Sequence, residues 1–191
     1  MSAAHVLTPL PKVVADDFPA DALYEIIDDV IVELPPRSVN SAATCGDLAT
    51  FLTNYGLANN VGKAYPEMLM RLNPSGKKSR RPDIVFIPFT KWARGVRVPE
   101  MNAWEIVPHL CVEVVSPNDT ADEQETKLEE YFQAGVPLIW VVYPRQERVY
   151  VYDSPTQVRR LSRADTLDGG TVLPGFQLAL AELFLAPPPK S

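Results

Sequence analysis

Two acidic residues in this sequence stand where they could bind a metal ion. Asp83 follows Pro82 and directly precedes an apolar run over residues 84–88, and Glu113 is the one charged residue in the run 110–115. Such short apolar runs are typical of buried strands. A buried carboxylate without a partner costs several kcal/mol, so Glu113 must meet a cation, a metal or water. Two carboxylates on adjacent strands can hold Mg²⁺ and leave its other positions to water and a phosphate.

The segment after Glu113 is predicted to form a helix and a second strand. Thr120 and Glu123 have the spacing of a capping box, and Gly135 suits a helix C-terminus. Another apolar run covers residues 138–143. A strand, a helix and a strand in this order predict a right-handed βαβ unit with two parallel strands.

Lys127 is the candidate amine of this unit. Lys127, Tyr131 and Ala134 fall on one helix face, which we expect to lie against the sheet. The amine could then position water or neutralise charge on a phosphate beside Glu113. The alternative is that Lys127 pairs with Glu123 on the solvated face.

The remaining segments predict an α/β protein with a mixed central sheet flanked by helices, preceded by an N-terminal hairpin and helix. The helix is expected to begin after Ser38 and to stop at Gly56. Residues 61–72 are expected to be extended, with an irregularity at Pro66. The other expected elements are a hairpin over 23–27 and 30–34, a hairpin over 138–143 and 148–153, a strand near 158–161 and an amphipathic stretch over 178–185.

Length and composition fit a single globular domain. The chain has 191 residues, 46% hydrophobic and 22% charged, and no apolar run approaches the roughly 20 residues of a membrane span. We expect a flexible arm over residues 1–18, one domain over 19–185 and a disordered tail over 186–191. Two cysteines cannot form a disulfide framework, and the N-terminus does not have the pattern of a signal peptide, so a cytoplasmic protein is expected.

Positive charge is concentrated in one stretch of an otherwise acidic chain. The formal net charge is −6, yet the segment from Arg71 to Arg97 contains one acid, Asp83, and eight basic residues. The candidates for contact with nucleic-acid phosphates are Lys77, Lys78, Arg80 and Arg81. A solvated loop is the alternative interpretation of this stretch.

Several motifs occur in the order found in a known family. The sequence resembles the PD-(D/E)XK nuclease superfamily and, within it, the bacterial Uma-two family of restriction-endonuclease-like proteins. The resemblance covers residues 17–184 and rests on the motifs at 24–28, 81–87, 112–117 and 173–176, and on Lys127, Tyr131, Gly135-Val136 and Trp140.

The resemblance implies a restriction-endonuclease-like fold and a metal-dependent endonuclease. Asp83, Glu113 and Lys127 would be catalytic, and the two acids would bind Mg²⁺ or Mn²⁺. The superfamily motif places its lysine two residues after the second acid, where this chain has Val115. Lys127 would therefore be a migrated lysine, reaching the site from the helix.

Three further expectations remain open at the level of sequence. Glu67 is a candidate additional acid, with an exposed strand residue as the alternative. The resemblance implies nucleic acid as partner, DNA in the first place, and a homodimer would supply two sites for cutting a duplex. The competing function is a catalytically inactive module that keeps the nuclease fold and binds nucleic acid or protein, a reading that Val115 favours.

Overall fold

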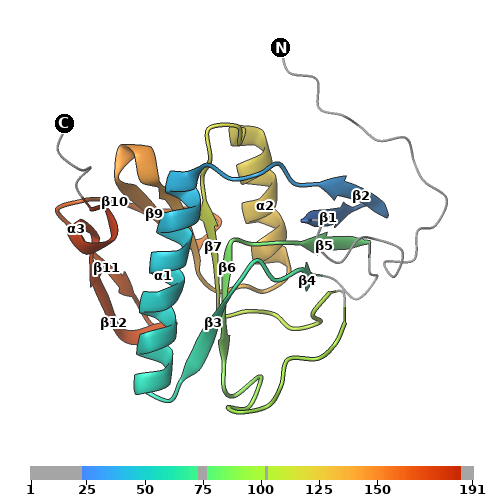
Figure 1. The fold of residues 1–191 in the computed structure, drawn as a ribbon, viewed down its shortest axis with the longest axis horizontal. Helices are drawn as coiled ribbons and strands as arrows, with labels where there is room; N and C mark the ends of the chain where they lie inside the picture. The colour runs from blue at the N-terminus through green and yellow to red at the C-terminus, as the bar shows by residue number, and fades with distance from the viewer. Residues whose placement is uncertain (1–22, 73–76, 102, 186–191) are drawn as a thin grey trace.

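The computed structural model describes residues 23–72, 77–101 and 103–185. The expected arm over 1–18, the turn over 73–76 and the tail over 186–191 lie outside the described residues. The fold is built on a six-stranded mixed sheet with the order β10-β9-β8-β7-β6-β3 (Figure 1). Its strands are β3 (Gly62–Pro66), β6 (Ile84–Pro88), β7 (Leu110–Val114), β8 (Ile139–Tyr143), β9 (Arg148–Ser154) and β10 (Gln157–Ser162).

The centre of this sheet is the predicted βαβ unit. Strands β7 and β8 are parallel, and helix α2 (Ala121–Gln133) connects them. Thr120 and Glu123 form the predicted capping box, and Gly135 has a φ of 89°. The expected hairpin of β8 and β9 is also confirmed, with antiparallel pairing and a 3-10 turn over Pro144–Gln146.

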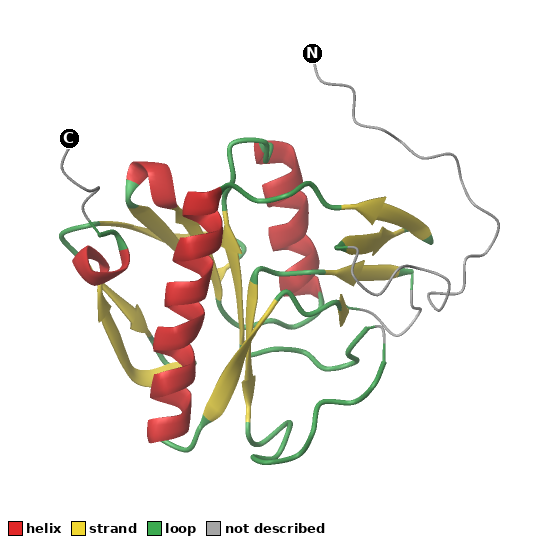
Figure 2. Cartoon of the chain, in the orientation of Figure 1, coloured by secondary structure: helices red, strands yellow, loops and turns green. Residues whose placement is uncertain are grey.

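The two long helices cover opposite faces of the sheet (Figure 2). Helix α1 (Val39–Ala58) packs Leu48 and Leu52 into one core cluster with Phe86, whereas α2 packs Leu128 into the other cluster with Val85. Because neighbouring residues of a strand point to opposite faces, each central strand contributes to both clusters.

Helix α1 begins as predicted but continues past the expected stop. Ser38 is its N-cap, and the helix ends at Ala58 rather than at Gly56. Gly56 instead permits close packing, because a Cβ there would lie 2.4 Å from the carbonyl oxygen of Gly62. A glycine in this helix is therefore a packing residue and not a terminator.

A second sheet, with the order β2-β1-β5-β4, lies beside α2. The predicted hairpin of β1 (Tyr24–Ile27) and β2 (Val30–Glu33) is confirmed, with positive φ at Asp28 and Asp29 in its turn. Strands β4 (Met70–Arg71) and β5 (Lys78–Arg80) complete this sheet, and β5 pairs with β1.

The C-terminal segment corrects one expectation. Residues 178–185 do not form one amphipathic stretch, because Leu178 belongs to strand β12 (Leu173–Ala179) and only α3 (Leu180–Leu183) is helical. Strand β12 pairs with β11 (Thr166–Gly169). Leu167 and Leu178 are buried in the same core cluster as α1, so this unit extends the cover over that face of the sheet.

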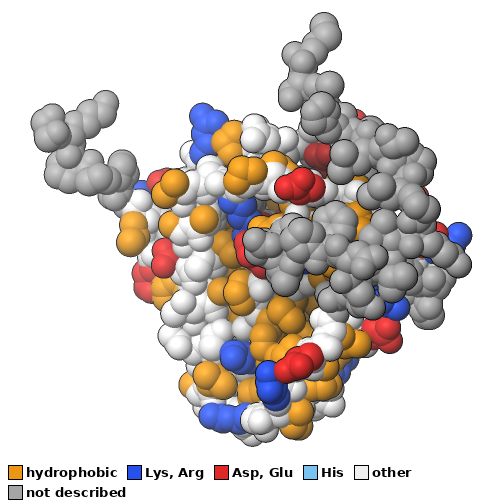
Figure 3. Space-filling view, turned by 45° about the vertical axis from the view of Figure 1, so that its right-hand side comes forward, with side chains coloured by type: hydrophobic (Ala, Val, Ile, Leu, Met, Phe, Trp, Pro, Cys, Tyr) orange, Lys and Arg blue, Asp and Glu red, His pale blue; other side chains and the backbone are white. Residues whose placement is uncertain are grey.

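The long connection between β6 and β7 is held by aromatic packing. Trp92 and Trp104 meet edge to face with ring centroids 5.3 Å apart, and Trp104 also forms an isolated β-bridge with Met70. Figure 3 shows hydrophobic side chains gathered on the lower half of this side of the molecule.

None of the described helices is long and apolar enough to cross a membrane.

Candidate active site

The two predicted acids come from neighbouring strands. Strands β6 and β7 are antiparallel with Ile84 opposite Val112 and Val85 opposite Cys111, so one further step brings Asp83 next to Glu113. Side-chain alternation places both acids on the face of the sheet that α2 covers. The predicted adjacency of the acid-bearing strands is therefore confirmed.

Glu113 is almost fully enclosed between the sheet and α2. Its side chain is 3% exposed. The hydroxyl of Tyr131 donates to Oε1 at 2.5 Å, and Nζ of Lys127 donates to Oε2 at 3.2 Å. Burial raises the pKa of Glu113 above its ordinary value, although Lys127 and Tyr131 oppose that shift.

Lys127 faces the sheet and not the solvent. Its Nζ also lies 3.7 Å from Oε1 of Glu25, whereas Glu123 is engaged with Thr120 in the capping box. The alternative pairing of Lys127 with Glu123 is therefore wrong. Burial alone would lower the pKa of Lys127, but the nearby carboxylates, Glu113 first among them, outweigh burial and raise it.

Asp83 is held by two donors. Its Oδ2 accepts a hydrogen bond of 2.5 Å from the backbone N–H of Val114, and its Oδ1 accepts one from Nη2 of Arg37. Burial and the charge of Glu113 raise the pKa of Asp83 to about 7, against the opposing effect of Arg37. An acid that ionises near neutrality in a buried pair is typical of a functional site.

Glu67 joins this group through Arg37. Its Oε1 lies 3.5 Å from Nη2 of Arg37, and its backbone N–H donates to the carbonyl of Asp83 at 3.0 Å. Glu67 has a φ of 53°, a left-handed conformation that costs energy for a residue with a Cβ. The turn after Pro66 therefore aims the Glu67 carboxylate towards the site.

A buried ion network connects the site to the second sheet. Glu25 on β1 pairs with Arg80 at 2.7 Å and accepts from the backbone N–H of Arg81 at 3.0 Å. Arg80 also donates to Glu130 of α2 at 2.5 Å, and Lys78 donates to the same carboxylate at 2.8 Å. Through Glu25, this network reaches Lys127.

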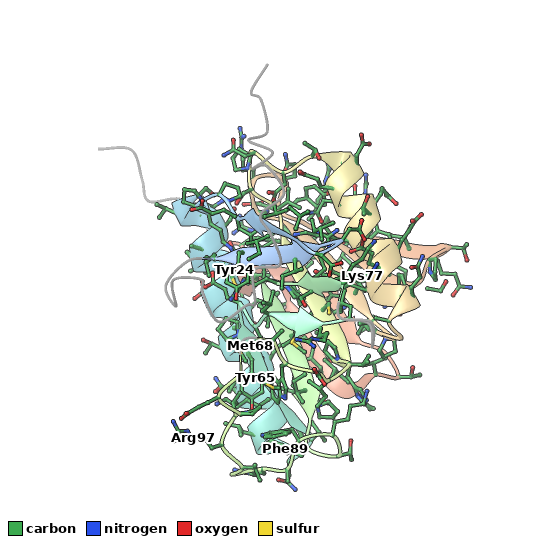
Figure 4. The ribbon with its side chains drawn as sticks, turned by 90° about the vertical axis from the view of Figure 1, so that its right-hand side faces the viewer. Tyr24, Tyr65, Met68, Lys77, Phe89 and Arg97 are labelled. Atoms are coloured by element: carbon green, nitrogen blue, oxygen red, sulfur yellow. The ribbon has the colours of Figure 1, made fainter. Side chains whose placement is uncertain are left out.

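The four candidate phosphate-binding residues do not form one exposed patch. Lys77 is exposed, at the end of the small sheet opposite Tyr24 (Figure 4). Lys78 and Arg80 are paired with Glu130, and Arg80 is 5% exposed. Arg81 donates to the backbone carbonyls of Tyr24 and Glu67. Burial therefore keeps Arg80 from a nucleic acid, and Lys77 is the most accessible of the four.

Two residues of this site, Arg37 and Glu25, were not among the predicted site residues, although Glu25 lies in the motif at 24–28. Glu25 interrupts an apolar strand in the same way as Glu113, so the same signal could have found it. Arg37 follows Pro35-Pro36 and precedes the helix cap, and no local pattern distinguishes it from a surface arginine.

The donor set fits a hard divalent cation. Asp83 and Glu113 supply carboxylate oxygens from adjacent strands, and Arg37 and Lys127 now balance their charge. Within the described residues, no three His, Cys, Asp or Glu residues cluster at metal-binding distance. Two carboxylates are nonetheless enough for Mg²⁺, which keeps several water ligands.

The central mixed sheet with one long helix on each face makes this an α/β protein. The family model Uma2, described as "Putative restriction endonuclease", matches residues 10–181, and the chain belongs to this family. The fold is similar to the crystal structure of a "putative nuclease belonging to DUF820" from Anabaena variabilis. That similarity has a TM-score of 0.75 and 17% identity, and it covers 90% of this chain and 97% of the other. A search of curated proteins finds no match.

Proposed function

We propose that this protein is a metal-dependent endonuclease that hydrolyses phosphodiester bonds in DNA. The observation that carries the proposal is the pair of buried acids, Asp83 and Glu113, with the Lys127 amine 3.2 Å from Glu113. Burying these three charged side chains lowers the stability of the fold relative to apolar residues of similar size, which supports a functional role for them. Membership of the Uma2 family supports the same reaction class.

Each residue has a distinct role in this proposal. Asp83 and Glu113 would hold Mg²⁺ or Mn²⁺, which supplies Lewis-acid stabilisation and a water of lowered pKa. Lys127 holds a positive charge beside Glu113 and stabilises negative charge on the phosphate. Tyr131 donates to Oε1 of Glu113 and fixes the orientation of that carboxylate.

The direct test is cleavage by the purified protein. Single-stranded DNA, duplex DNA and RNA would be incubated with Mg²⁺, with Mn²⁺ and with EDTA. We expect internal cuts in DNA that need the metal and that Asp83→Asn abolishes. Asp153→Asn is the matched control, because it makes the same change at an exposed position on β9. Absence of metal-dependent cleavage of any of these substrates would refute the proposal.

One observation favours the inactive module as a second candidate. All four carboxylate oxygens of Asp83 and Glu113 already accept a hydrogen bond from the protein. A metal must share or displace these donors. If Mg²⁺ and Mn²⁺ bind wild type only weakly, and Asp83→Asn changes neither metal binding nor DNA binding, the inactive module is supported over the endonuclease.

A further inference from the structure

Arg37 connects three segments of the chain that are far apart in the sequence. It lies in the connection between β2 and α1, one residue before the helix cap Ser38. Its guanidinium contacts Asp83, which precedes β6, and Glu67, which follows β3. The side chain is 16% exposed, so it lies at the rim of the site and not deep within the core.

The atom that Arg37 contacts is the one a metal would need. Oδ2 of Asp83 accepts from the backbone N–H of Val114, a bond fixed by the strand, and Arg37 is bound to the other oxygen, Oδ1. A divalent cation at Oδ1 would place two positive charges beside the guanidinium. Like charges at such short range repel strongly at a partly buried site, where water screens them less than in bulk solvent. Arg37 therefore has to leave Asp83 when a metal binds.

Arg37 differs in this respect from Lys127. If a metal takes the oxygens of Glu113, Lys127 keeps a second, buried partner in Glu25. Of the two carboxylates that contact Arg37 among the described residues, Glu67 would remain, with a side chain that is 39% exposed and a contact of 3.5 Å that is longer than the contact with Asp83. Ion pairs with exposed carboxylates contribute little free energy. The guanidinium of Arg37 is therefore released from its carboxylate partner more easily than the ammonium of Lys127.

A released guanidinium at this rim has a natural acceptor in the substrate. The planar fork of donors of an arginine matches two phosphate oxygens, a geometry that lysine cannot provide. We propose that Arg37 is a catalytic residue. Its guanidinium is paired with Asp83 in the metal-free protein, and when the metal binds, the guanidinium moves to a non-bridging oxygen of the scissile phosphate. The inference rests on the proposed function, because it assumes a metal at Asp83 and a phosphodiester substrate.

The transfer predicts effects of opposite sign on the two ligands. In Arg37→Met, the Mg²⁺ affinity measured by calorimetry should rise about tenfold, because the metal no longer displaces a cation. In Ca²⁺, the affinity for a fluorescein-labelled DNA duplex should fall on the order of tenfold, because a phosphate ligand is lost. If Arg37 were purely structural, Arg37→Met would weaken both the Mg²⁺ affinity and the DNA affinity. If Arg37 were a simple counter-ion of Asp83, Arg37→Met would leave the DNA affinity unchanged. Either result overturns the proposal.

A matched control separates this contact from a loss of charge. Arg81→Met removes one positive charge two residues from Asp83, but the Arg81 side chain donates to backbone carbonyls and not to a carboxylate. Its Mg²⁺ affinity should stay near that of wild type. An equal increase in Mg²⁺ affinity in Arg37→Met and in Arg81→Met would contradict the proposed movement of Arg37.

Two measurements keep the test decisive if Arg37→Met does not fold. Arg37→Gln keeps a donor for Asp83 without the charge, and the same opposite effects are expected. In wild type, the side-chain NMR signals of Arg37 should change on adding Mg²⁺ and again on adding the duplex, and unchanged signals would overturn the proposal. If wild type binds no metal, the proposed function fails as well. If it binds metal and Arg37 variants bind it no tighter, only the transfer fails.

Discussion

The charge state of Lys127 limits what this residue can do. Three carboxylates, those of Glu113, Glu25 and Asp83, raise its pKa against the effect of burial. The amine is therefore protonated at neutral pH and cannot serve as a general base. Its contribution must be electrostatic, acting on the attacking water or on the charge that develops at the phosphate.

Replacing Lys127 by methionine should remove activity and keep the fold. Methionine suits a helix and retains most of the apolar stem. Cleavage should fall on the order of 100-fold, the scale expected when one preorganised electrostatic group is lost. Metal should still bind at Asp83 and Glu113, and more tightly, because a neighbouring positive charge is gone. Full activity of the folded variant would contradict a catalytic role.

The rescue of that variant tests the geometry. Val115 packs with the same core cluster as Cys111, so it shares the sheet face of Glu113. Adding Val115→Lys to Lys127→Met should restore part of the cleavage rate, because the amine returns to the position of the superfamily motif. A double variant that folds, binds metal and remains inactive would show that the sheet position cannot replace the helix position.

The raised pKa of Asp83 predicts a pH-dependent metal affinity. Between its ordinary value of 3.8 and the folded value of about 7, folded Asp83 binds more protons than it does unfolded. Without metal, its contribution to stability is complete below 3.8 and is lost as pH rises through 7. A metal competes with that proton, so Mg²⁺ affinity should rise with pH below 7 and level off above it. Calorimetry in buffers of different ionisation enthalpy should detect proton release at pH 6, and pH-independent binding without proton release would exclude Asp83 as ligand.

Three residues of the site could be singled out from local patterns. Asp83 directly precedes an apolar run, Glu113 interrupts one, and Lys127 lies on the helix face of Tyr131. The contact of Arg37 with Asp83 spans 46 positions of the sequence. It depends on the packing of the connection before α1 over strand β6, which no local period describes.

At the scale of elements, the second sheet positions the site. Strand β1 carries Glu25, and β5 carries Arg80, so their pairing brings this buried ion pair to α2. Glu130 on α2 receives Arg80 and lies one turn from Lys127. The network therefore sets the distance between the small sheet and the helix that presents the amine.

Breaking this network should destabilise the protein. In Glu25→Gln, buried Arg80 loses one of two charged partners, and such a change typically costs about 3 kcal/mol. Urea denaturation would measure the loss in the free energy of unfolding. Glu100→Gln is the control, because its ion pair with Arg97 is exposed and should contribute little. A loss no larger than that of the control would show that Glu25 does not support the fold.

The hairpin of β1 and β2 was predictable, but strand β5, which pairs with β1, was not. Asp28-Asp29 between two apolar runs is a local turn signal. Strand β5 has only three residues, Lys78–Arg80, and a polar sequence, so neither alternation nor hydrophobicity indicates a strand. Ion pairs and long-range strand pairing hold it, and both depend on the tertiary fold.

In the whole molecule, both long helices and two small sheets surround one central sheet (Figures 1 and 2). The face under α1 is apolar, whereas the face under α2 encloses Asp83 and Glu113 among hydrophobic residues. The βαβ unit was predicted because its signals are local. The closing strand β12 was not, because Pro174 and Gly175 obscure its alternation and its partner β11 is only four residues long.

The coupling of the site to the whole fold gives a final prediction. Mg²⁺ that binds only the folded protein should stabilise it by about 2.7 kcal/mol at 100 times the Kd. For a domain of this size, that corresponds to a rise in Tm of about 5–10 °C. Asp83→Asn, which removes one ligand charge, should lose most of this rise, and Asp153→Asn should keep it. Scanning calorimetry with and without Mg²⁺ would measure the shift. An equal rise in Asp83→Asn and wild type would place the metal elsewhere on the protein.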